Sequence, residues 1–245
     1  MKIASTASPA ISAPRAESDG GGTLAGPNGR AGPAEVAAGV EAAGCRALGL
    51  VADLHDRSAL QAAAAAVEDA WGGVDLLVNN AVDTAPGSMV PVTELTVAQL
   101  EAKLSANAVA PFVLLRAVLP GMLARGGGTV VDVTSHTATA DPPAKVGAGG
   151  WGVAYAASKA AAHRFAPSLA VELGDRGIRA YNVDPGYVET ERQVVNAAAL
   201  GLTDRYRGAP PSVPAAAIAW LVDHPEAVAN GSTVRAQKVA LTEGL

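Results

Sequence analysis

Tyr155 and Lys159 are the two residues whose types and spacing most directly suggest chemistry. They lie four positions apart in the Ala-rich segment AYAASKAAA, so in a helix their side chains share one face. A free phenol titrates at about pH 10, and a neighbouring ammonium favours its ionised form. The pair could therefore act as a general acid/base in proton transfer. Taken alone, the same spacing also fits an ordinary pair on a helix surface.

Two further polar residues could belong to the same site. Ser135 closes the apolar run GTVVDVTS, and its hydroxyl could donate a hydrogen bond that stabilises developing charge on a substrate oxygen. It could instead cap a turn, and Thr134 could take its place. Asn107 lies inside a long predicted helix, where asparagine is an indifferent helix former. A purely local hydrogen-bonding role is equally compatible with Asn107.

These residues fall on, or at the ends of, alternating helix and strand patterns. Alternation of this kind predicts crossover connections, a mostly parallel sheet and helices on both faces. Ligands of such a doubly wound α/β fold bind beyond the carboxyl ends of the strands. The patterns predict strands over 47–54, 74–79, 128–134, 178–183 and 232–236, and helices over 34–43, 60–71, 96–125, 153–173 and 214–222.

Local signals predict where two of the helices begin. Ser58 with Gln61 and Thr96 with Gln99 both have the spacing of a capping box, in which the two side chains satisfy free backbone N–H groups. Pro111 should kink the helix over 96–125, because proline has no N–H to donate.

From residue 34 to the C-terminus the chain resembles the short-chain dehydrogenase/reductase family. The resemblance is carried by an Asn-Asn-Ala turn, a helix asparagine, a strand-end serine, a Tyr-x-x-x-Lys pair and a Pro-Gly turn, found here as residues 79–81, Asn107, Ser135, Tyr155 with Lys159, and Pro185-Gly186. It implies a Rossmann-like fold and hydride transfer between NAD or NADP and a small alcohol or carbonyl substrate. In such a site Tyr155 exchanges the proton and Ser135 orients the reacting oxygen.

The resemblance also implies roles for the other residues. Lys159 would lower the pKa of Tyr155 and contact the nicotinamide ribose, while Asn107 would hold a water that relays protons. Asp53 and Leu54 would contact the adenine, although Asp53 could instead be a helix cap, a role that suits Asp56 better. The remaining cofactor contacts would come from Asn80, Ala81, Pro185, Gly186, Val188 and Thr190. Val82 stands where the family usually has glycine.

Residues 1–33 do not fit the family pattern. They are rich in Ser, Pro, Gly and Ala and predict an irregular or flexible segment, followed by one domain over 34–245. Gly20, Gly22 and Ala25 match Gly-x-Gly-x-x-Ala, but no apolar strand precedes them, and the prolines and glycines that follow forbid the helix such a turn needs. The first βαβ unit is therefore predicted to be incomplete.

Three explanations of the incomplete unit remain open. The chain is an altered or truncated form of an active ancestor, a natural relative without cofactor, or a protein completed by another subunit; the intact catalytic set favours the first. A catalytically inactive binding or scaffold protein of the same fold is the main alternative function. A fragment that does not fold by itself is a weaker one.

Composition and charge limit the other function classes. A net charge of −5 gives no basic field for nucleic acid, and we expect that no apolar stretch reaches the length of about 20 residues that crosses a bilayer. The histidines lack metal-ligand spacing, and the single cysteine, Cys45, is expected to be buried. We expect a cytoplasmic protein without metal, and the family resemblance implies a homodimer or homotetramer.

Overall fold

A parallel β-sheet forms the centre of the molecule. The structure is a computed structural model that describes residues 3–5, 33–190 and 208–245. In this part of the chain five strands follow one another in the order β1-β2-β3-β4-β5, and every neighbouring pair is parallel. They are β1 (Ile3–Ser5), β2 (Leu76–Asn79), β3 (Gly128–Val133), β4 (Ile178–Asp184) and β5 (Thr233–Arg235).

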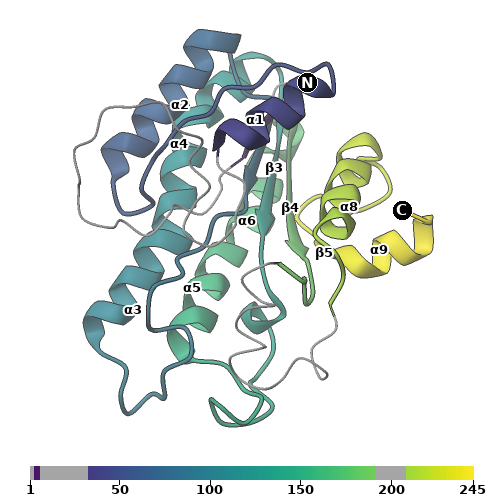
Figure 1. Cartoon of the computed structure of the whole chain (residues 1–245). Helices are drawn as coiled ribbons and strands as arrows, with labels where there is room; N and C mark the ends of the chain where they lie inside the picture. The colour runs from purple at the N-terminus through teal and green to yellow at the C-terminus, as the bar shows by residue number, and fades with distance from the viewer. Residues whose placement is uncertain (1–2, 6–32, 191–207) are drawn as a thin grey trace.

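Helices cover both faces of this sheet, as Figure 1 shows. On one side lie α2 (Arg57–Trp71), α4 (Ala110–Ala124), α5 (Val153–His163) and α6 (Phe165–Leu173), and on the other α8 (Ser212–Asp223) and α9 (Ala236–Glu243). Further helical elements are α1 (Pro33–Ala42), α3 (Val97–Leu104), the π-helix η1 (Ser105–Val109) and the 3-10 turns η2 (His136–Ala138) and η3 (Gly174–Arg176). The predicted doubly wound architecture is confirmed.

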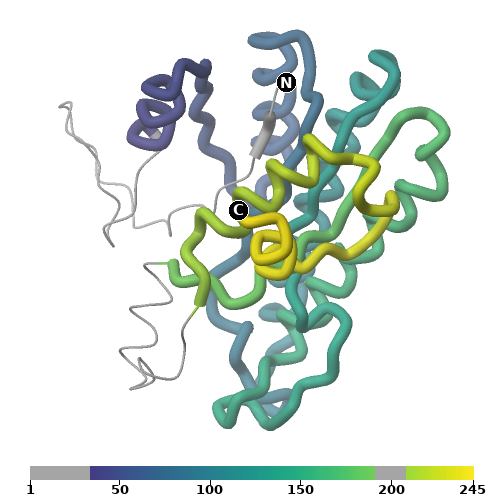
Figure 2. Tube along the Cα trace, turned by 90° about the vertical axis from the view of Figure 1, so that its right-hand side faces the viewer, coloured from purple at the N-terminus to yellow at the C-terminus, as the bar shows by residue number. Residues whose placement is uncertain are grey.

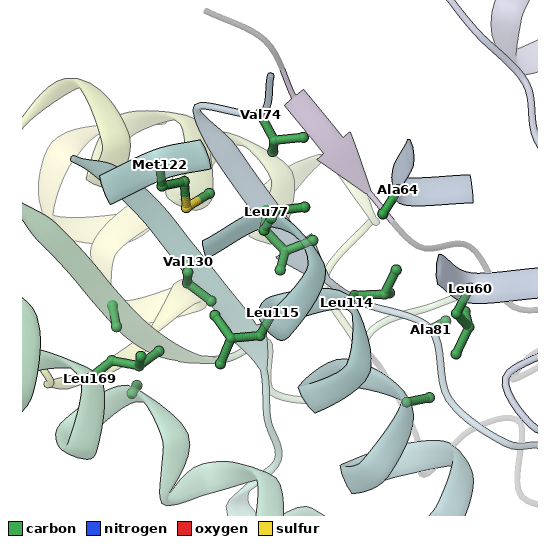
Figure 3. Packing of buried hydrophobic residues seen from close by; sticks show 14 of the residues in the cluster. Leu60, Ala64, Val74, Leu77, Ala81, Leu114, Leu115, Met122, Val130 and Leu169 are labelled. Carbon is green, nitrogen blue, oxygen red and sulfur yellow. The ribbon is translucent and has the colours of Figure 1, made fainter. Parts of the chain in front are cut away.

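The strands are apolar on both sides because each side carries its own core. In β2, Leu77 packs into the cluster under α2 and α4, whereas Leu76 and Val78 belong to the cluster under α8. Figure 3 shows the first cluster, in which Leu115 and Val130 meet between α4 and β3. Side chains of successive strand residues point to opposite faces, so continuous apolar runs are what a doubly covered sheet requires.

The N-terminus contributes a strand that the sequence prediction missed. Ile3 to Ser5 form β1, which pairs in parallel with β2 in the register Ile3 to Leu76. The segment 1–33 is therefore not irregular throughout, and an apolar strand does precede the glycine pattern. Three residues are too short a run for strand periodicity to be recognised. Gly20, Gly22 and Ala25 lie outside the described residues.

The predicted strand over 47–54 is wrong. These residues join no strand, and Val51 has 88% of its surface exposed. The cysteine expected to be buried, Cys45, is exposed as well. The helix before this segment, α1, is also exposed along almost its whole length, and in Figure 2 it stands apart from the other helices. A strand needs a neighbouring strand to satisfy its backbone N–H and C=O groups. None of the described strands pairs with residues 47–54.

The helix over 96–125 forms as one continuous stretch, Val97–Ala124. Thr96 and Gln99 make the predicted capping box, whereas the box predicted from Ser58 and Gln61 does not form, because Asp56 caps α2. Pro111 has no N–H for the carbonyl four residues before it, and the helix widens there into the π turn of η1.

The same stretch is the one described helix whose length and composition would allow it to cross a membrane. Half of its most apolar window is buried inside the protein, where α4 packs on α2 and α3 packs on α5. Such contacts are those of a core helix.

Candidate active site

Tyr155 and Lys159 lie on α5, one helical turn apart, at the carboxyl end of β3. Gly152 precedes the helix and places its backbone N–H against Ser88 O at 3.1 Å. Lys159 is buried, with 6% of its surface exposed, and its Nζ donates to the backbone oxygen of Val133 at 2.8 Å. Its ammonium is thus directed toward the end of the sheet.

Tyr155 differs from the sequence expectation in its acidity. Burial raises the pKa of its phenol, a hydrogen bond with the Ser135 side chain lowers it, and the charge of Asp184 raises it, so that the net shift is upward. The predicted lowering by Lys159 is wrong, because the ammonium is engaged with β3 rather than with the phenol. At neutral pH Tyr155 therefore carries its proton.

Ser135, and not Thr134, faces the phenol. Ser135 shares a hydrogen bond with Tyr155, and its Oγ also accepts from the N–H of Thr137 at 3.3 Å, which caps η2. Thr134 is buried, and its hydroxyl lies 3.2 Å from Nδ1 of His163. This position favours Ser135 over Thr134 as the proposed partner of the substrate oxygen, and Ser135 caps η2 at the same time.

Asn107 is held by both atoms of its amide. Its Oδ1 accepts from the N–H of Asp83 at 2.8 Å, and its Nδ2 donates to Ser158 Oγ at 3.0 Å. Ser158 in turn donates to the backbone oxygen of Tyr155 at 2.8 Å. The side chain therefore connects the turn after β2 to the helix that carries Tyr155.

The turn after β2 is fixed by a second set of contacts. Lys103 on α3 is fully buried, forms an ion pair with Asp83 at 2.9 Å, and also donates to the backbone oxygens of Asp83 and Ala85. Burial tends to raise the pKa of Asp83, but its hydrogen bonds with Ala85 and Lys103 give a net lowering. Sequence reasoning missed this set of contacts, because Lys103 has the pattern of a solvated residue on an amphipathic helix.

Asp132 and Asn79 form a buried polar pair beside Lys159. Asn79 Nδ2 donates to Asp132 Oδ1 at 2.7 Å. Burial raises the pKa of Asp132 to about 6, with the Asn79 hydrogen bond and the Lys159 charge opposing it, and burial lowers the pKa of Lys159 to about 8, opposed by Asp132. Sequence reasoning missed Asp132, although an acid between valines of a buried strand is itself a signal.

The residues predicted to contact the adenosine lie in the segment before α2 and in the turn after β2. Asp53 is exposed and accepts from the N–H of His55 at 2.9 Å, whereas Leu54 is buried in the core. Asp56, not Asp53, is the helix cap, as expected. Ala81 is buried at the end of β2, and Asn80 beside it is exposed.

The Pro-Gly turn follows β4 and is held in shape by α9. Gln237 donates from Nε2 to the backbone oxygens of Pro185 and Tyr187 at 3.0 and 2.8 Å. Gly186 has φ 68°, and a Cβ there would meet Gln237, so glycine is required. Val188 bridges to Ala209, and Thr190 donates its N–H to the Val188 oxygen at 3.0 Å.

Comparison with known proteins identifies the family. The family model described as short chain dehydrogenase matches residues 16–199. The chain is 36% identical over 152 residues to a short chain dehydrogenase of Pseudocercospora fijiensis, covering 62% of this chain and 47% of that protein. It is 34% identical over 143 residues to D-threitol dehydrogenase of Mycolicibacterium smegmatis, covering 58% and 51%. The chain thus spans about half the length of these curated relatives.

A solved structure shows the same fold. L-sorbose reductase from Gluconobacter frateurii, complexed with NADPH and L-sorbose, aligns with a TM-score of 0.72 and 25% identity over 82% of this chain and 80% of that one. Together with the parallel sheet, these matches show the fold of a short-chain dehydrogenase. The chain belongs to the short-chain dehydrogenase family.

Proposed function

We propose that this chain is an NAD- or NADP-dependent oxidoreductase that transfers a hydride between the nicotinamide and a small alcohol or carbonyl substrate. The observation that carries the proposal is the hydrogen bond between Tyr155 and Ser135 at the carboxyl end of β3. Support comes from the family match and from the neighbour that binds NADPH and L-sorbose.

The described residues fit the nicotinamide half of such a cofactor. A phenol, a hydroxyl and an ammonium gather near one strand end, and the Pro185-Gly186 backbone of the adjoining strand is held rigidly by Gln237. We propose that Lys159 contacts the ribose and that Val188 and Thr190 border the carboxamide and phosphate. Asp53, Leu54, Asn80 and Ala81 would take the adenosine. When bound, the reduced nicotinamide supplies the hydride.

In the direction of carbonyl reduction, Tyr155 is the general acid. Its raised pKa keeps the phenol protonated at neutral pH, so it can give its proton to the carbonyl oxygen as negative charge develops there. Ser135 donates a second hydrogen bond to the same oxygen. Asn107 keeps α5 in register through Ser158, and it would also hold a water that relays protons between Lys159 and bulk solvent. A homodimer or homotetramer and a cytoplasmic location remain predictions.

The first test is a matched pair of tyrosine variants. Tyr155→Phe should lower turnover by about 10²- to 10⁴-fold, because it deletes the proton donor and keeps the ring. Tyr181→Phe makes the same change in the opposite core, where the hydroxyl only meets Pro225 O at 3.3 Å, and should leave turnover nearly unchanged. NADPH oxidation with L-sorbose and NAD reduction with D-threitol serve as assays.

Cofactor binding is measured separately by the fluorescence of NADH and NADPH during titration with protein. A saturable change is expected for one of the two. Absence of any change with both would support the alternative of an inactive binding or scaffold protein, and full turnover in Tyr155→Phe would refute the proton-donor role.

A further inference from the structure

A small cavity lies behind the proposed catalytic residues, between the ends of β2 and β3 and the helix α5. Its volume is about 10 Å³, which is room for roughly one water molecule. Its polar walls come from the side chains of Asn79, Asn107, Asp132, Thr134, Lys159 and His163. A cavity of this size among polar groups is where a protein holds an internal water.

Two oxygen atoms beside this cavity have unused hydrogen-bonding capacity. Asn79 and Asp132 are 6% and 4% exposed, and each uses one atom for their mutual hydrogen bond. Within the described part of the chain, the other oxygens, Asn79 Oδ1 and Asp132 Oδ2, are buried without a hydrogen-bond partner. Leaving two buried acceptors unsatisfied is costly, and one water molecule, which has two donors, can satisfy both.

Lys159 completes the set of partners for such a water. An ammonium has three N–H donors, and Lys159 uses one of them on Val133 O. A second donor is available to a water molecule in the cavity that Lys159 lines. The water would then make three hydrogen bonds, which is the usual number for a buried one.

We propose that Asp132 and Asn79 hold a buried water molecule against the Lys159 ammonium, and that the Asp132 carboxylate is the counter-ion that fixes the charge and position of this ammonium. Asp132 is then a positioning residue of the site, and its effect on turnover depends on the function proposed above. Its role is to keep Lys159 charged at the end of β3, where we propose that Lys159 contacts the cofactor ribose.

Among the titratable groups around the cavity, Asp132 is the one that acts as a counter-ion of Lys159. The cavity wall contributed by β2 and its turn and by the helix over 97–124 is uncharged, with Asn79, Ala81, Asn107 and Pro111. From α5 the wall carries Lys159 and His163, and burial lowers the pKa of His163, so that its ring is neutral at pH 7.

Two titratable groups lie close by on other elements. Asp184, at the end of β4, acts on His163 and Tyr155, and Tyr155 is neutral at pH 7. Asp132 is the acid whose charge bears on Lys159. With the pKa of Asp132 at about 6 and that of Lys159 at about 8, both groups are charged at neutral pH.

The test measures the titration of Lys159 directly. The chain has five lysines, so the ε-carbon resonance of Lys159 can be assigned in ¹³C-lysine-labelled protein from its loss in Lys159→Gln. In Asp132→Asn the titration midpoint of Lys159 should fall by on the order of one pH unit, because the attraction that stabilised the charged form is gone. An unchanged midpoint would overturn the proposal.

Two controls separate charge from structure. Asp175→Asn removes one exposed carboxylate at η3, at the opposite end of β4 from the site, and should leave the midpoint in place. The exchanged variant Asn79→Asp/Asp132→Asn moves the carboxylate to the other side of the same hydrogen bond and should restore the midpoint toward that of the wild type. Failure of the exchange to restore it would contradict the counter-ion role.

If Asp132→Asn does not fold, the titration of Lys159 in the wild-type protein tests the counter-ion role of Asp132. Coupled groups show each other's titration, so the Lys159 resonance should have a second inflection where the Asp132 γ-carbon titrates. A single inflection would overturn the proposal.

Turnover gives a second readout that separates this inference from the proposed function. The alkaline limb of the kcat/KM profile should move to lower pH in Asp132→Asn and return in the exchanged variant. If the wild type shows no turnover, the proposed function fails while the Lys159 titration still tests Asp132. If turnover is normal and the midpoint does not move, the inference alone fails.

Discussion

Two regions of this chain have similar sequences and different structures. The runs ALGLVADL at 47–54 and GTVVDV in β3 are both apolar with one aspartate. Yet Val131 in β3 is fully buried, whereas Val51 is 88% exposed. The difference is that β3 has strands on both sides and the run at 47–54 pairs with none of the described strands. An apolar pattern shows that a segment can form a strand, but pairing depends on a partner elsewhere in the chain.

The proposed site likewise has one part at a paired strand and another part at the unpaired run over 47–54. Tyr155, Ser135 and Lys159 lie at the end of a fully paired strand and are fixed by hydrogen bonds to it and to each other. Asp53 lies at the end of the run that stays unpaired, and it is exposed. We therefore expect the nicotinamide half of the site to be preorganised and the adenosine half to depend on what covers the 47–54 segment.

The largest effect that tests this comparison is on stability. Leu115→Ala should reduce the free energy of unfolding by about 2–5 kcal/mol, because it leaves a cavity between α4 and the sheet. Leu115 is 4% exposed, whereas Leu50, in the unpaired run, is 41% exposed. Leu50→Ala should change the free energy of unfolding by less than about 0.5 kcal/mol. Urea unfolding measures both, and equal losses would show that the two regions are packed alike in solution.

A smaller loss of stability is expected when a polar contact of the paired region is removed. Asn107→Ala should reduce the free energy of unfolding by about 1–3 kcal/mol, because the buried N–H of Asp83 and the hydroxyl of Ser158 both lose their partner. Ser158→Ala removes one of these contacts and should cost less. Thermal unfolding of the two variants provides the measurement. An Asn107→Ala protein as stable as the wild type would mean that the turn after β2 does not need this tether.

Much of the fold could be predicted because its signals are local. The strands at 74–79, 128–134 and 178–183 were recognised from short apolar runs, and each forms close to its predicted bounds. The missing strand β1 and the false strand at 47–54 have one cause. Whether three N-terminal residues add to the edge of β2, or eight apolar residues find no neighbour, depends on contacts between distant segments, which no local pattern records.

The positions of the proposed site residues in the fold were predictable from the sequence, but their electrostatics were not. The spacing of Tyr155 and Lys159 correctly placed both on one helix at the sheet edge. It did not reveal that Lys159 turns toward Val133 O and Asp132, so the direction of the pKa shift of Tyr155 was wrong. Burial and the position of a charge are three-dimensional properties, and here they outweigh the spacing.

The two capping-box patterns allow the finest comparison, because one forms and the other does not. Thr96 Oγ1 accepts from the N–H of Gln99 at 3.2 Å, and Gln99 Oε1 accepts from the N–H of Thr96 at 3.0 Å. Thr96→Ala should therefore lower the free energy of unfolding by about 1 kcal/mol. In α2 the N–H groups are capped by Asp56, so Ser58→Ala should cost no more than about 0.5 kcal/mol. If urea unfolding showed equal losses for the two variants, Ser58 would contribute as much to its helix end as a true cap, and the assignment of Asp56 would be wrong.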